Sequence, residues 1–360
     1  MPKKLKISKV IPIFKKKEKF LPVNYRPISL LSIFDKILEK LMHKRLYSFL
    51  TKHEILYDYQ FGFRSQHSTT LAIVEIVDNI RNDLDKSNHV LGLYLDLSKA
   101  FDCVDHAILI DKLSHYGIRG LALEWFKSYL RDRSQKTYVN NTYSNACPIN
   151  TGVPQGSVLG PILFLIYVND IANCINQGKV RLFADDTNLF FSDKSIPTLQ
   201  SQANSALANL YKWFSANKLT LNSDKTCYTL FSNSKNVPPI ELFLNGHAIK
   251  QVSETKYMGM HLDERLNWKC HINCINSKLS QLTGAFRYLA SYIKPANAKQ
   301  IYYAYVFPYI KYGIEVGTCD PSIMKTLQIS QNKLLKLLTN RERRFSTDNL
   351  HSNLKLLKCN

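Results

Sequence analysis

The sequence has no apolar run long enough to cross a bilayer. The run that stands out covers only 162–168, whereas a membrane-spanning helix needs about 20 consecutive apolar residues. The N-terminus opens Met1-Pro2-Lys3-Lys4 without the apolar core of a signal peptide, and no internal repeat or low-complexity tract is present. We therefore expect an intracellular protein that does not enter membranes, in the nucleus or the cytoplasm, with the nucleus favoured.

The eight cysteines do not follow the spacing of a disulfide framework. In an intracellular protein such cysteines are expected to be reduced thiols. The segment from Cys270 to Cys274 suggests zinc, but no second Cys/His pair follows at zinc-finger spacing, and the two cysteines lie four apart on an expected helix. We therefore assign no zinc site.

Acidic residues are scarce relative to basic ones: 28 Asp and Glu face 48 Lys and Arg, for a formal net charge of +20. Such an excess predicts attraction to a polyanion, with an affinity that falls steeply as salt is added. The alternative is a merely solvated basic surface. The tyrosines between 302 and 312 would either stack on a bound strand or lie in a helical core. The lysine run at 15–19 is open to nuclear targeting, phosphate contacts or a solvated loop.

Two adjacent carboxylates, Asp185 and Asp186, are flanked on both sides by apolar segments. Flanks of this kind predict a β-hairpin with the acid pair at its turn. Mg²⁺ prefers carboxylate and water oxygens and takes few protein carboxylates, which leaves coordination sites for phosphates. Asp96 ends the short apolar run 90–95, which is typical of a buried strand. The three acids together predict a two-metal phosphoryl-transfer site.

The alternative is that the acid pair is structural, because Asp favours turns by bonding to nearby backbone. A second signal favours chemistry. Between the two acid-bearing segments lies the Gly/Pro-punctuated loop 151–161, which runs into the apolar, helix-like segment 162–168.

Seven blocks of the sequence resemble, in order and spacing, the motifs of a known family. The segments 94–102, 152–161 and 183–186 resemble the palm motifs of a reverse transcriptase. The segments 24–31 and 60–65 resemble finger motifs of the non-LTR branch, the enzymes of LINE-like retrotransposons, and 213–226 and 256–268 resemble its remaining palm motifs and primer grip.

The resemblance implies an RNA-directed DNA polymerase that extends a primer 3′-hydroxyl with dNTPs by two-metal phosphoryl transfer. Its cofactor would be two Mg²⁺ ions, with Mn²⁺ as an alternative, and its partners an RNA template, a DNA primer and dNTPs. Metal ligands are implied at Asp96, Asp185 and Asp186, with Asp96 and Asp185 the firmer two. The Leu97 carbonyl would be a further ligand, unless it bonds only within the sheet.

The resemblance also implies residues that bind the nucleotide. Phe101 would lie beneath its sugar and exclude a 2′-hydroxyl, with packing against the following helix as the alternative. Gln155 and Gly156 would touch the nucleotide and template, while Gly152 and Pro154 shape their loop.

Three basic residues complete the implied site. Arg64 would clamp the triphosphate, because a guanidinium matches phosphate with two donors; a surface ion pair is its alternative. Lys225 would act near the leaving pyrophosphate as a general acid, with a solvated lysine as the alternative. Arg26 would contact either the template or acidic residues of the fingers. Asp102 and Asp105 are assigned to capping and local structure.

The implied fold class is α/β (α+β), a right-hand polymerase with an antiparallel palm sheet. We expect fingers over 1–90, a palm over 91–265, and a helical thumb with a C-terminal tail over 266–360. Within these regions we expect helices at 32–50, 69–84, 105–116 and 198–216, hairpins at 183–191 and 240–249, and only helices from about 268, with breaks near Pro295 and at 313–321.

The sequence departs from the family pattern in two ways. Phe183 replaces the more familiar Tyr of the acid motif, a change we expect to be tolerated. LINE-like proteins usually carry an upstream endonuclease and often a downstream Cys/His segment, and neither appears here. We therefore expect a polymerase fragment whose fingers are incomplete at the N-terminus, with an apolar face of the 32–50 helix uncovered.

Two other functions compete with the polymerase. One is a catalytically inactive nucleic-acid-binding remnant of a retrotransposon, which the intact acids disfavour. The other is a template-copying RNA polymerase, which Phe101 and the Ala-Asp-Asp turn disfavour.

Overall fold

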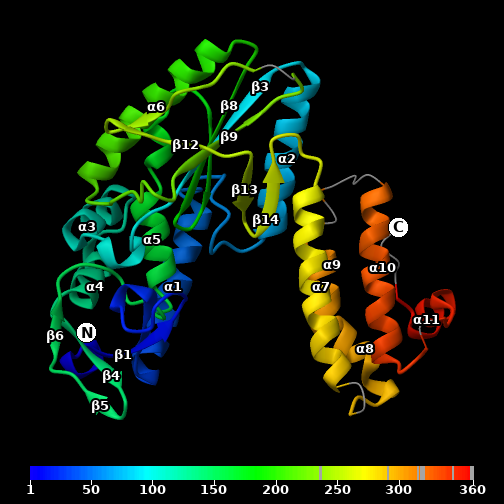
Figure 1. Cartoon of the computed structure of the whole chain (residues 1–360). Helices are drawn as coiled ribbons and strands as arrows, with labels where there is room; N and C mark the ends of the chain where they lie inside the picture. Colours follow the sequence, from blue (N-terminus) through cyan, green and yellow to red (C-terminus); the bar gives the residue numbers. More distant parts are fainter. Residues whose placement is uncertain (235–236, 290–291, 314–315, 317–320, 343, 357–360) are drawn as a thin grey trace.

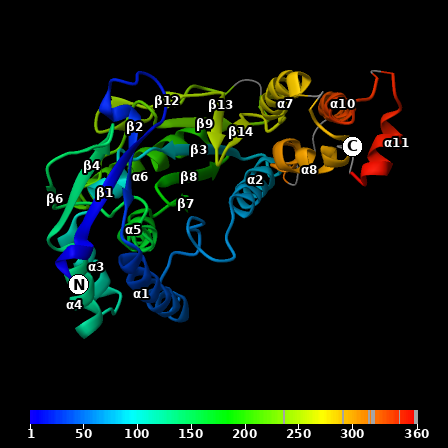
Figure 2. The ribbon, with the colours of Figure 1, turned by 90° about the horizontal axis from the view of Figure 1, so that it is seen from below.

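The computed structural model describes residues 1–234, 237–289, 292–313, 316, 321–342 and 344–356 (Figure 1). Its fold is mixed α/β, with two larger sheets in the first two thirds of the chain and helices in the last third. The C-terminal helices lie to one side of the sheet-containing body in both Figure 1 and Figure 2.

A five-stranded sheet of order β12-β9-β3-β8-β7 forms the centre of the molecule. Its strands are β3 (His89–Leu95), β7 (Lys179–Phe183), β8 (Asp186–Asp193), β9 (Cys227–Phe231) and β12 (Lys250–Gln251). β3 pairs antiparallel with both β8 and β9. It is buried from Val90 to Leu95, as expected of a strand covered on both faces. The sequence-predicted strand at 90–96 and the hairpin at 183–191 are therefore confirmed.

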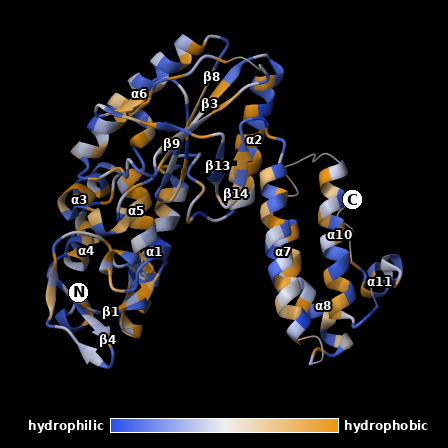
Figure 3. Cartoon of the chain, viewed as in Figure 1, coloured by the Kyte–Doolittle hydropathy of each residue, from blue (hydrophilic) through white to orange (hydrophobic). Residues whose placement is uncertain are grey.

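Each face of this sheet packs against different elements, because side chains alternate along a strand. Leu91, Leu93 and Leu95 join the core formed with α5 (Gly160–Val168) and α6 (Ile196–Ala216). Val90 and Tyr94 join a second core formed with α2 (Thr69–Asp85) and the ribbon described below. α5 is buried from Ile162 to Val168, as its uniformly apolar sequence requires (Figure 3).

A second sheet lies in the N-terminal part of the body. It joins β1 (Ile7–Phe14), β2 (Tyr25–Leu30), β4 (Arg133–Val139), β5 (Thr142–Tyr143) and β6 (Cys147–Ile149). β1 pairs parallel with β4, more than 100 residues away in the chain. The sequence did not predict these strands. The strands carry many exposed and polar residues, so their alternation of apolar and polar positions is weak.

Three more helices belong to the same body: α1 (Ile33–Lys52), α3 (His106–His115) and α4 (Gly120–Leu130). α3 packs against α4 and α5. Ser32 caps α1 by accepting from Asp35 N–H, and Asp105 caps α3 by accepting from Ala107 and Ile108 N–H. Both helices lie where the sequence predicts them. Part of α1 is uncovered as expected, with Ile33, Phe34, Ile37 and Leu41 exposed.

Strands continue past residue 249, where the sequence predicted none. The predicted 240–249 hairpin contains only β10 (Phe243–Leu244) and β11 (His247–Ala248), and a ribbon of β13 (Glu254–Tyr257) and β14 (Met260–Asp263) follows. Tyr257, Met260 and Leu262 of the ribbon are buried in the core shared with α2. The ribbon alternates buried and exposed positions over four residues only, too short a pattern to be recognised in the sequence.

The rest of the chain is helical, as predicted. It contains α7 (Lys269–Leu289), α8 (Ala298–Ile301), a π-helical turn (Tyr302–Val306), α9 (Phe307–Lys311), α10 (Pro321–Leu338) and α11 (Thr347–Leu354). These helices share a core of their own. The expected break near Pro295 is a short 3₁₀ turn, Pro295–Asn297, and most of the expected break at 313–321 lies outside the described residues. No described helix is long and apolar enough to span a membrane.

Candidate functional site

The three predicted acids meet at one end of the central sheet. Asp96 directly follows β3, and Asp186 begins β8 after the turn at Ala184 and Asp185. The register pairs Leu95 with Thr187, so that one step further places Asp96 opposite Asp186. The hairpin closes with Phe183 paired to Asp186. Residues 90 positions apart in the chain are thus brought together by strand pairing alone.

The carboxylates repel one another. Burial raises the pKa of Asp185 and the nearby charge of Asp96 raises it further, while Arg26 and Lys225 lower it. Burial, followed by the charges of Asp185 and Asp96, raises the pKa of Asp186 to about 6. A cluster of acids whose pKa values are raised by their neighbours is typical of a functional site.

Lys225 lies beside this cluster. Its Nζ is 2.7 Å from Oδ2 of Asp96. The lysine itself is 64% exposed, which places the ion pair at the rim where solvent and a substrate reach it. The loop that carries Lys225 is held to the same strand end, because Asn222 N–H donates to the Asp96 carbonyl.

The donor set suits a hard divalent cation, although it is not a ready-made metal site. Within the described ranges no group of three or more His, Cys, Asp or Glu side chains is spaced to hold an ion. The carboxylates of Asp96, Asp185 and Asp186 are nevertheless the oxygen ligands that Mg²⁺ prefers, and a cation would relieve their mutual repulsion. The bridge between Leu97 and Leu221 uses the Asp96 carbonyl and the Ser98 N–H, so that it leaves the Leu97 carbonyl unused.

Phe101 lies in an aromatic stack beside this end of the sheet. Its ring stacks on Phe164 of α5 at a centroid distance of 4.5 Å, and the edge of Phe63 approaches at 6.3 Å. Phe101 is only half-buried. The packing alternative and the predicted contact with a nucleotide are therefore compatible, because one face of the ring is supported and part of it remains open.

Gln155 and Gly156 face the second sheet and the turn after β3. Gln155 Nε2 donates to Asp102 Oδ1 at 2.9 Å, and its carbonyl accepts from Ser29 N–H at 2.7 Å. Gly156 has φ +113°, and a Cβ there would lie 2.8 Å from the Ser29 carbonyl. Glycine is required here because the backbone at position 156 lies close to β2. Gly152 is constrained in the same way, by the Asp102 backbone.

The two predicted arginine contacts differ. Arg64 donates from Nη1 to the carbonyls of Tyr57 and Asp58, at 2.7 and 3.4 Å; the alternative of a surface ion pair for Arg64 is not seen in the described part of the chain. Arg26, on β2, is close enough to lower the pKa of Asp185. Of the two, Arg26 is therefore the one whose charge acts on an acid of the cluster.

Sequence reasoning missed Glu39, a fully buried carboxylate on α1. It accepts from the Tyr129 hydroxyl and, at 2.7 Å, from Val158 N–H. Burial raises its pKa, and these two donors oppose the rise. Glu39 thereby ties the loop that carries Gln155 to α1. The signal in the sequence is a pair of acids one helical turn apart, Asp35 and Glu39, on the same helix face as Leu46 and Leu50.

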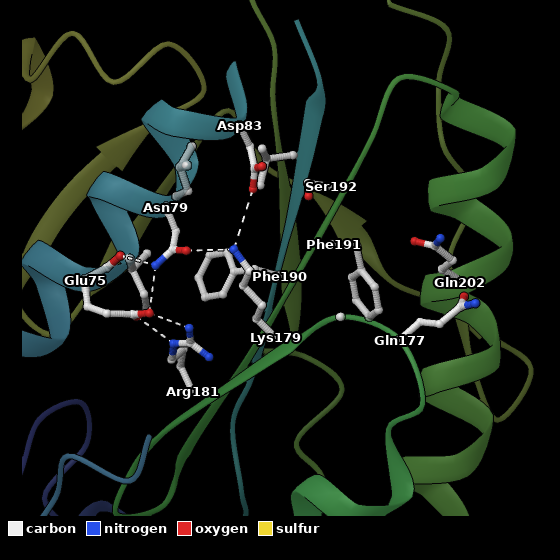
Figure 4. Close-up of a pocket in the computed structure, with 14 residues that line it drawn as sticks. Glu75, Asn79, Asp83, Gln177, Lys179, Arg181, Phe190, Phe191, Ser192 and Gln202 are labelled. Atoms are coloured by element: carbon white, nitrogen blue, oxygen red, sulfur yellow. Dashed lines mark hydrogen bonds and ion pairs between the residues drawn. The ribbon is translucent and has the colours of Figure 1, made fainter. Parts of the chain in front are cut away.

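A cavity of about 330 Å³ lies at the other end of β7, away from the acids. Figure 4 shows its polar wall, where Glu75, Asn79 and Asp83 of α2 face Lys179 and Arg181 of β7. Arg181 Nε donates to Glu75 at 2.6 Å, and Lys179 donates to Asn79 at 2.7 Å. These pairs fasten α2 across the edge of the sheet.

The C-terminal tyrosines divide between core and surface. Tyr302 is buried, whereas Tyr303, Tyr305 and Tyr309 are exposed. The exposed rings are available to a strand, and Tyr302 follows the core alternative. Cys270 and Cys274 lie on α7, as expected.

The chain resembles known proteins over most of its length. A family model described as "Reverse transcriptase (RNA-dependent DNA polymerase)" matches residues 13–262. The chain is 32% identical to the "Probable RNA-directed DNA polymerase from transposon BS" of Drosophila melanogaster, over 99% of the chain and 40% of that protein. It is 29% identical to the "RNA-directed DNA polymerase from mobile element jockey" of the same organism, with the same coverage. The chain thus spans about two fifths of the length of these relatives.

The fold is also similar to that of solved structures. A telomerase from Candida albicans, solved with a fragment of telomeric RNA, superposes with a TM-score of 0.54 at 13% identity and covers 99% of this chain and 68% of its own. A telomerase from Candida tropicalis gives a TM-score of 0.51 at 11% identity, covering 97% and 58%. At such low identity the likeness concerns the fold, and it confirms the predicted polymerase-like α/β class.

Proposed function

The chain belongs to the reverse transcriptase family, and from this premise we propose that it is an RNA-directed DNA polymerase that extends the 3′-hydroxyl of a DNA primer with dNTPs along an RNA template. One observation carries the proposal: Asp96, Asp185 and Asp186 converge at one end of the central sheet with raised pKa values for Asp185 and Asp186. Phosphoryl transfer needs little else from a protein than positioned charge.

Asp96, Asp185 and Asp186 would hold two Mg²⁺ ions, or Mn²⁺ in their place, with the Leu97 carbonyl as a further ligand. When bound, such ions activate the primer hydroxyl and stabilise the charge that develops on the phosphates. The chain's own contribution is to hold the three carboxylates together and orient them. Arg26 and Lys225 assist by lowering the pKa of Asp185.

Lys225 would change partners during the reaction. In the structure its ammonium is paired with Asp96, which masks one oxygen of that carboxylate. Because Asp96 would use its oxygens to hold a cation, the Lys225 ammonium would then be available to another partner. Because Lys225 is exposed at the rim, its proton could then pass to the leaving pyrophosphate.

Substrate selection would rest on the residues around this end of the sheet. Phe101, supported by Phe164, would exclude a 2′-hydroxyl, and Gln155 and Gly156 would line the same nucleotide. We keep Arg64 as a candidate triphosphate ligand, although its Nη1 is bonded to backbone carbonyls. The net charge of +20 suits an RNA and DNA partner.

Primer extension on poly(rA) with an oligo(dT) primer tests the function, with purified residues 1–360. We expect dTTP incorporation that requires Mg²⁺, and its loss in Asp96→Asn and in Asp185→Asn, each with duplex binding and melting temperature nearly unchanged. Asp111→Asn, at a titratable acid of α3 outside the site, is the matched control and should stay active. Normal activity in either site variant would contradict the assignment of these acids as metal ligands. Duplex binding without primer extension by the wild type would favour the inactive remnant.

A further inference from the structure

The turn that presents Asp185 has a backbone conformation that its sequence does not favour. Ala184 has φ +55°, a region that residues with a Cβ adopt rarely and glycine adopts freely. Ala184 is also buried, with 6% of its surface exposed. The two-residue turn between the paired Phe183 and Asp186 itself requires positive φ at this position. The conformational cost therefore falls on Ala184, and contacts from outside the hairpin can offset it.

The segment 59–62 is in contact with this turn. Phe61 N–H donates to the Leu182 carbonyl at 2.8 Å, and Leu182 N–H donates to the Tyr59 carbonyl at 3.0 Å. The segment thus adds a short parallel bridge to the edge of β7. A Cβ on Gly62 would lie only 2.4 Å from Ala184 N, so the two backbones are nearly in contact.

Gln60 joins the two backbones. It is 2% exposed, and its Oε1 accepts from Gly62 N–H at 2.8 Å and from Ala184 N–H at 3.0 Å. The orientation of the amide is fixed, because only its oxygen can accept from two N–H donors. Losing this acceptor would leave a buried N–H unpaired in a conformation that is already unfavourable.

Two further contacts hold the segment in place. Arg64 Nη1 bonds to the carbonyls of Tyr57 and Asp58, and the Arg181 guanidinium lies 3.8 Å from the centre of the Tyr59 ring. Gln60 is therefore presented to the turn from a rigid support that is anchored on β7 itself.

We propose that Gln60 is a positioning residue for the acid turn: its side-chain oxygen holds the Ala184 N–H and so fixes where Asp185 and Asp186 lie. Its catalytic consequence rests on the proposed polymerase function. Gln60 touches no substrate in this account and acts only through the backbone of the turn.

Amide exchange at Ala184, measured by NMR without metal, tests the contact independently of activity. The test variant is Gln60→Met, which keeps the side chain's length and removes its acceptor. The matched control is Asn169→Leu, because the Asn169 amide holds the same segment further back, at Tyr57 N–H and the Ile55 carbonyl. We expect exchange at Ala184 to rise at least about tenfold in Gln60→Met and to stay unchanged in Asn169→Leu. Unchanged exchange in Gln60→Met would overturn the proposal.

Metal binding and catalysis test the consequence. We expect Gln60→Met to bind Mn²⁺, followed by electron paramagnetic resonance, at least about threefold more weakly. It should lower kcat for primer extension at least about tenfold, with a smaller effect on the KM for dTTP. Asn169→Leu should lower the melting temperature without these changes. If Gln60→Met binds Mn²⁺ and turns over like the wild type, Gln60 is only structural and the proposal is wrong.

A double variant separates positioning from general destabilisation. Ala184→Gly removes the conformational penalty, so it should restore part of the kcat lost in Gln60→Met; equal losses in the two backgrounds would contradict the proposal. If Gln60→Met does not fold, Gln60→Asn withdraws the acceptor by one methylene and takes its place. A wild type that neither binds Mn²⁺ nor extends a primer refutes the proposed function, while the exchange measurement still decides the role of Gln60.

Discussion

Asp186 carries the site's clearest electrostatic signature, a pKa raised to about 6 by burial and by two neighbouring carboxylates. Since this folded-state pKa lies above the ordinary value of 3.8, the folded protein holds the proton more tightly than the unfolded chain does. Without metal, the free energy of unfolding should therefore fall as the pH rises between these two values. A cation that binds the ionised carboxylates would reverse this loss.

We predict from this that the Mg²⁺ concentration giving half-maximal primer extension rises as the pH falls through about 6, because protons and Mg²⁺ compete for the same oxygens. Titrating Mg²⁺ at a series of pH values measures it. In Asp186→Asn any remaining activity should show this dependence only at lower pH. A half-saturating concentration independent of pH between 5 and 8 would contradict the prediction.

The ring of Phe164 stacks on the ring of Phe101 and supports it. We predict that Phe101→Ala raises the incorporation of ribonucleotides relative to deoxynucleotides, by at least about tenfold in kcat/KM ratio. Phe164→Leu should shift the ratio in the same direction by less, since Phe101 would stay but lose its support. Competition between rUTP and dTTP measures both. An unchanged ratio in an active, folded Phe101→Ala variant would place Phe101 in the core alone.

Helix α1 controls the loop that carries Gln155, through Glu39. Tyr129 and Val158 donate to the two separate carboxylate oxygens of Glu39, and glutamine would keep only one of these acceptors. We predict that Glu39→Gln lowers the stability by about 1–3 kcal/mol and raises the KM for dTTP as the loop shifts. Thermal unfolding and steady-state kinetics measure the two effects.

Glu124→Gln is the matched control, because Glu124 is paired with Lys127 on the surface of α4. Such exposed pairs contribute little, so the control should change stability by less than about 1 kcal/mol. Equal effects of the two substitutions would show that Glu39 is not tied to the loop as the structure indicates.

Among the secondary-structure elements, the sequence predicted helices better than strands. α1, α2, α3 and α6 lie close to the predicted ranges, because each combines an apolar period with an N-cap residue such as Ser32, Ser68 or Asp105. β1, β2 and β4 were missed. Their partners lie far away in the chain, and a strand with one exposed face and few apolar residues becomes stable only when it is paired.

The whole molecule is a polycation, and its charge should govern its affinity. We predict that the logarithm of the association constant for an RNA·DNA duplex falls linearly with the logarithm of the salt concentration, with a slope near −0.9 for each phosphate contacted. Lys15 lies near the site, where its charge lowers the pKa of Asp102. Lys15→Gln should reduce the slope by about one. Lys127→Gln, paired with Glu124, should not. A salt-independent affinity would contradict the prediction.

The sequence by itself identified the three acids that meet in the structure and the order of the elements that carry them. Asp96 ends an apolar strand, and Asp185 and Asp186 lie between apolar flanks. These are local patterns, which can be recognised without knowing which distant segments pack against them. The predicted turn, the N-cap of α3 and the helical C-terminal third were all of this kind.

Only the tertiary structure decided what holds these parts in position. That Gln60 reaches Ala184, that Glu39 reaches Val158 and that Gly156 lies against Ser29 are contacts between segments 119 to 127 residues apart in the chain. The physical reason is that a buried polar group needs a hydrogen-bond partner, but the residues around it in the sequence do not show which distant group will be that partner. Each contact forms because strands and helices that are distant in the chain pack around the same sheet.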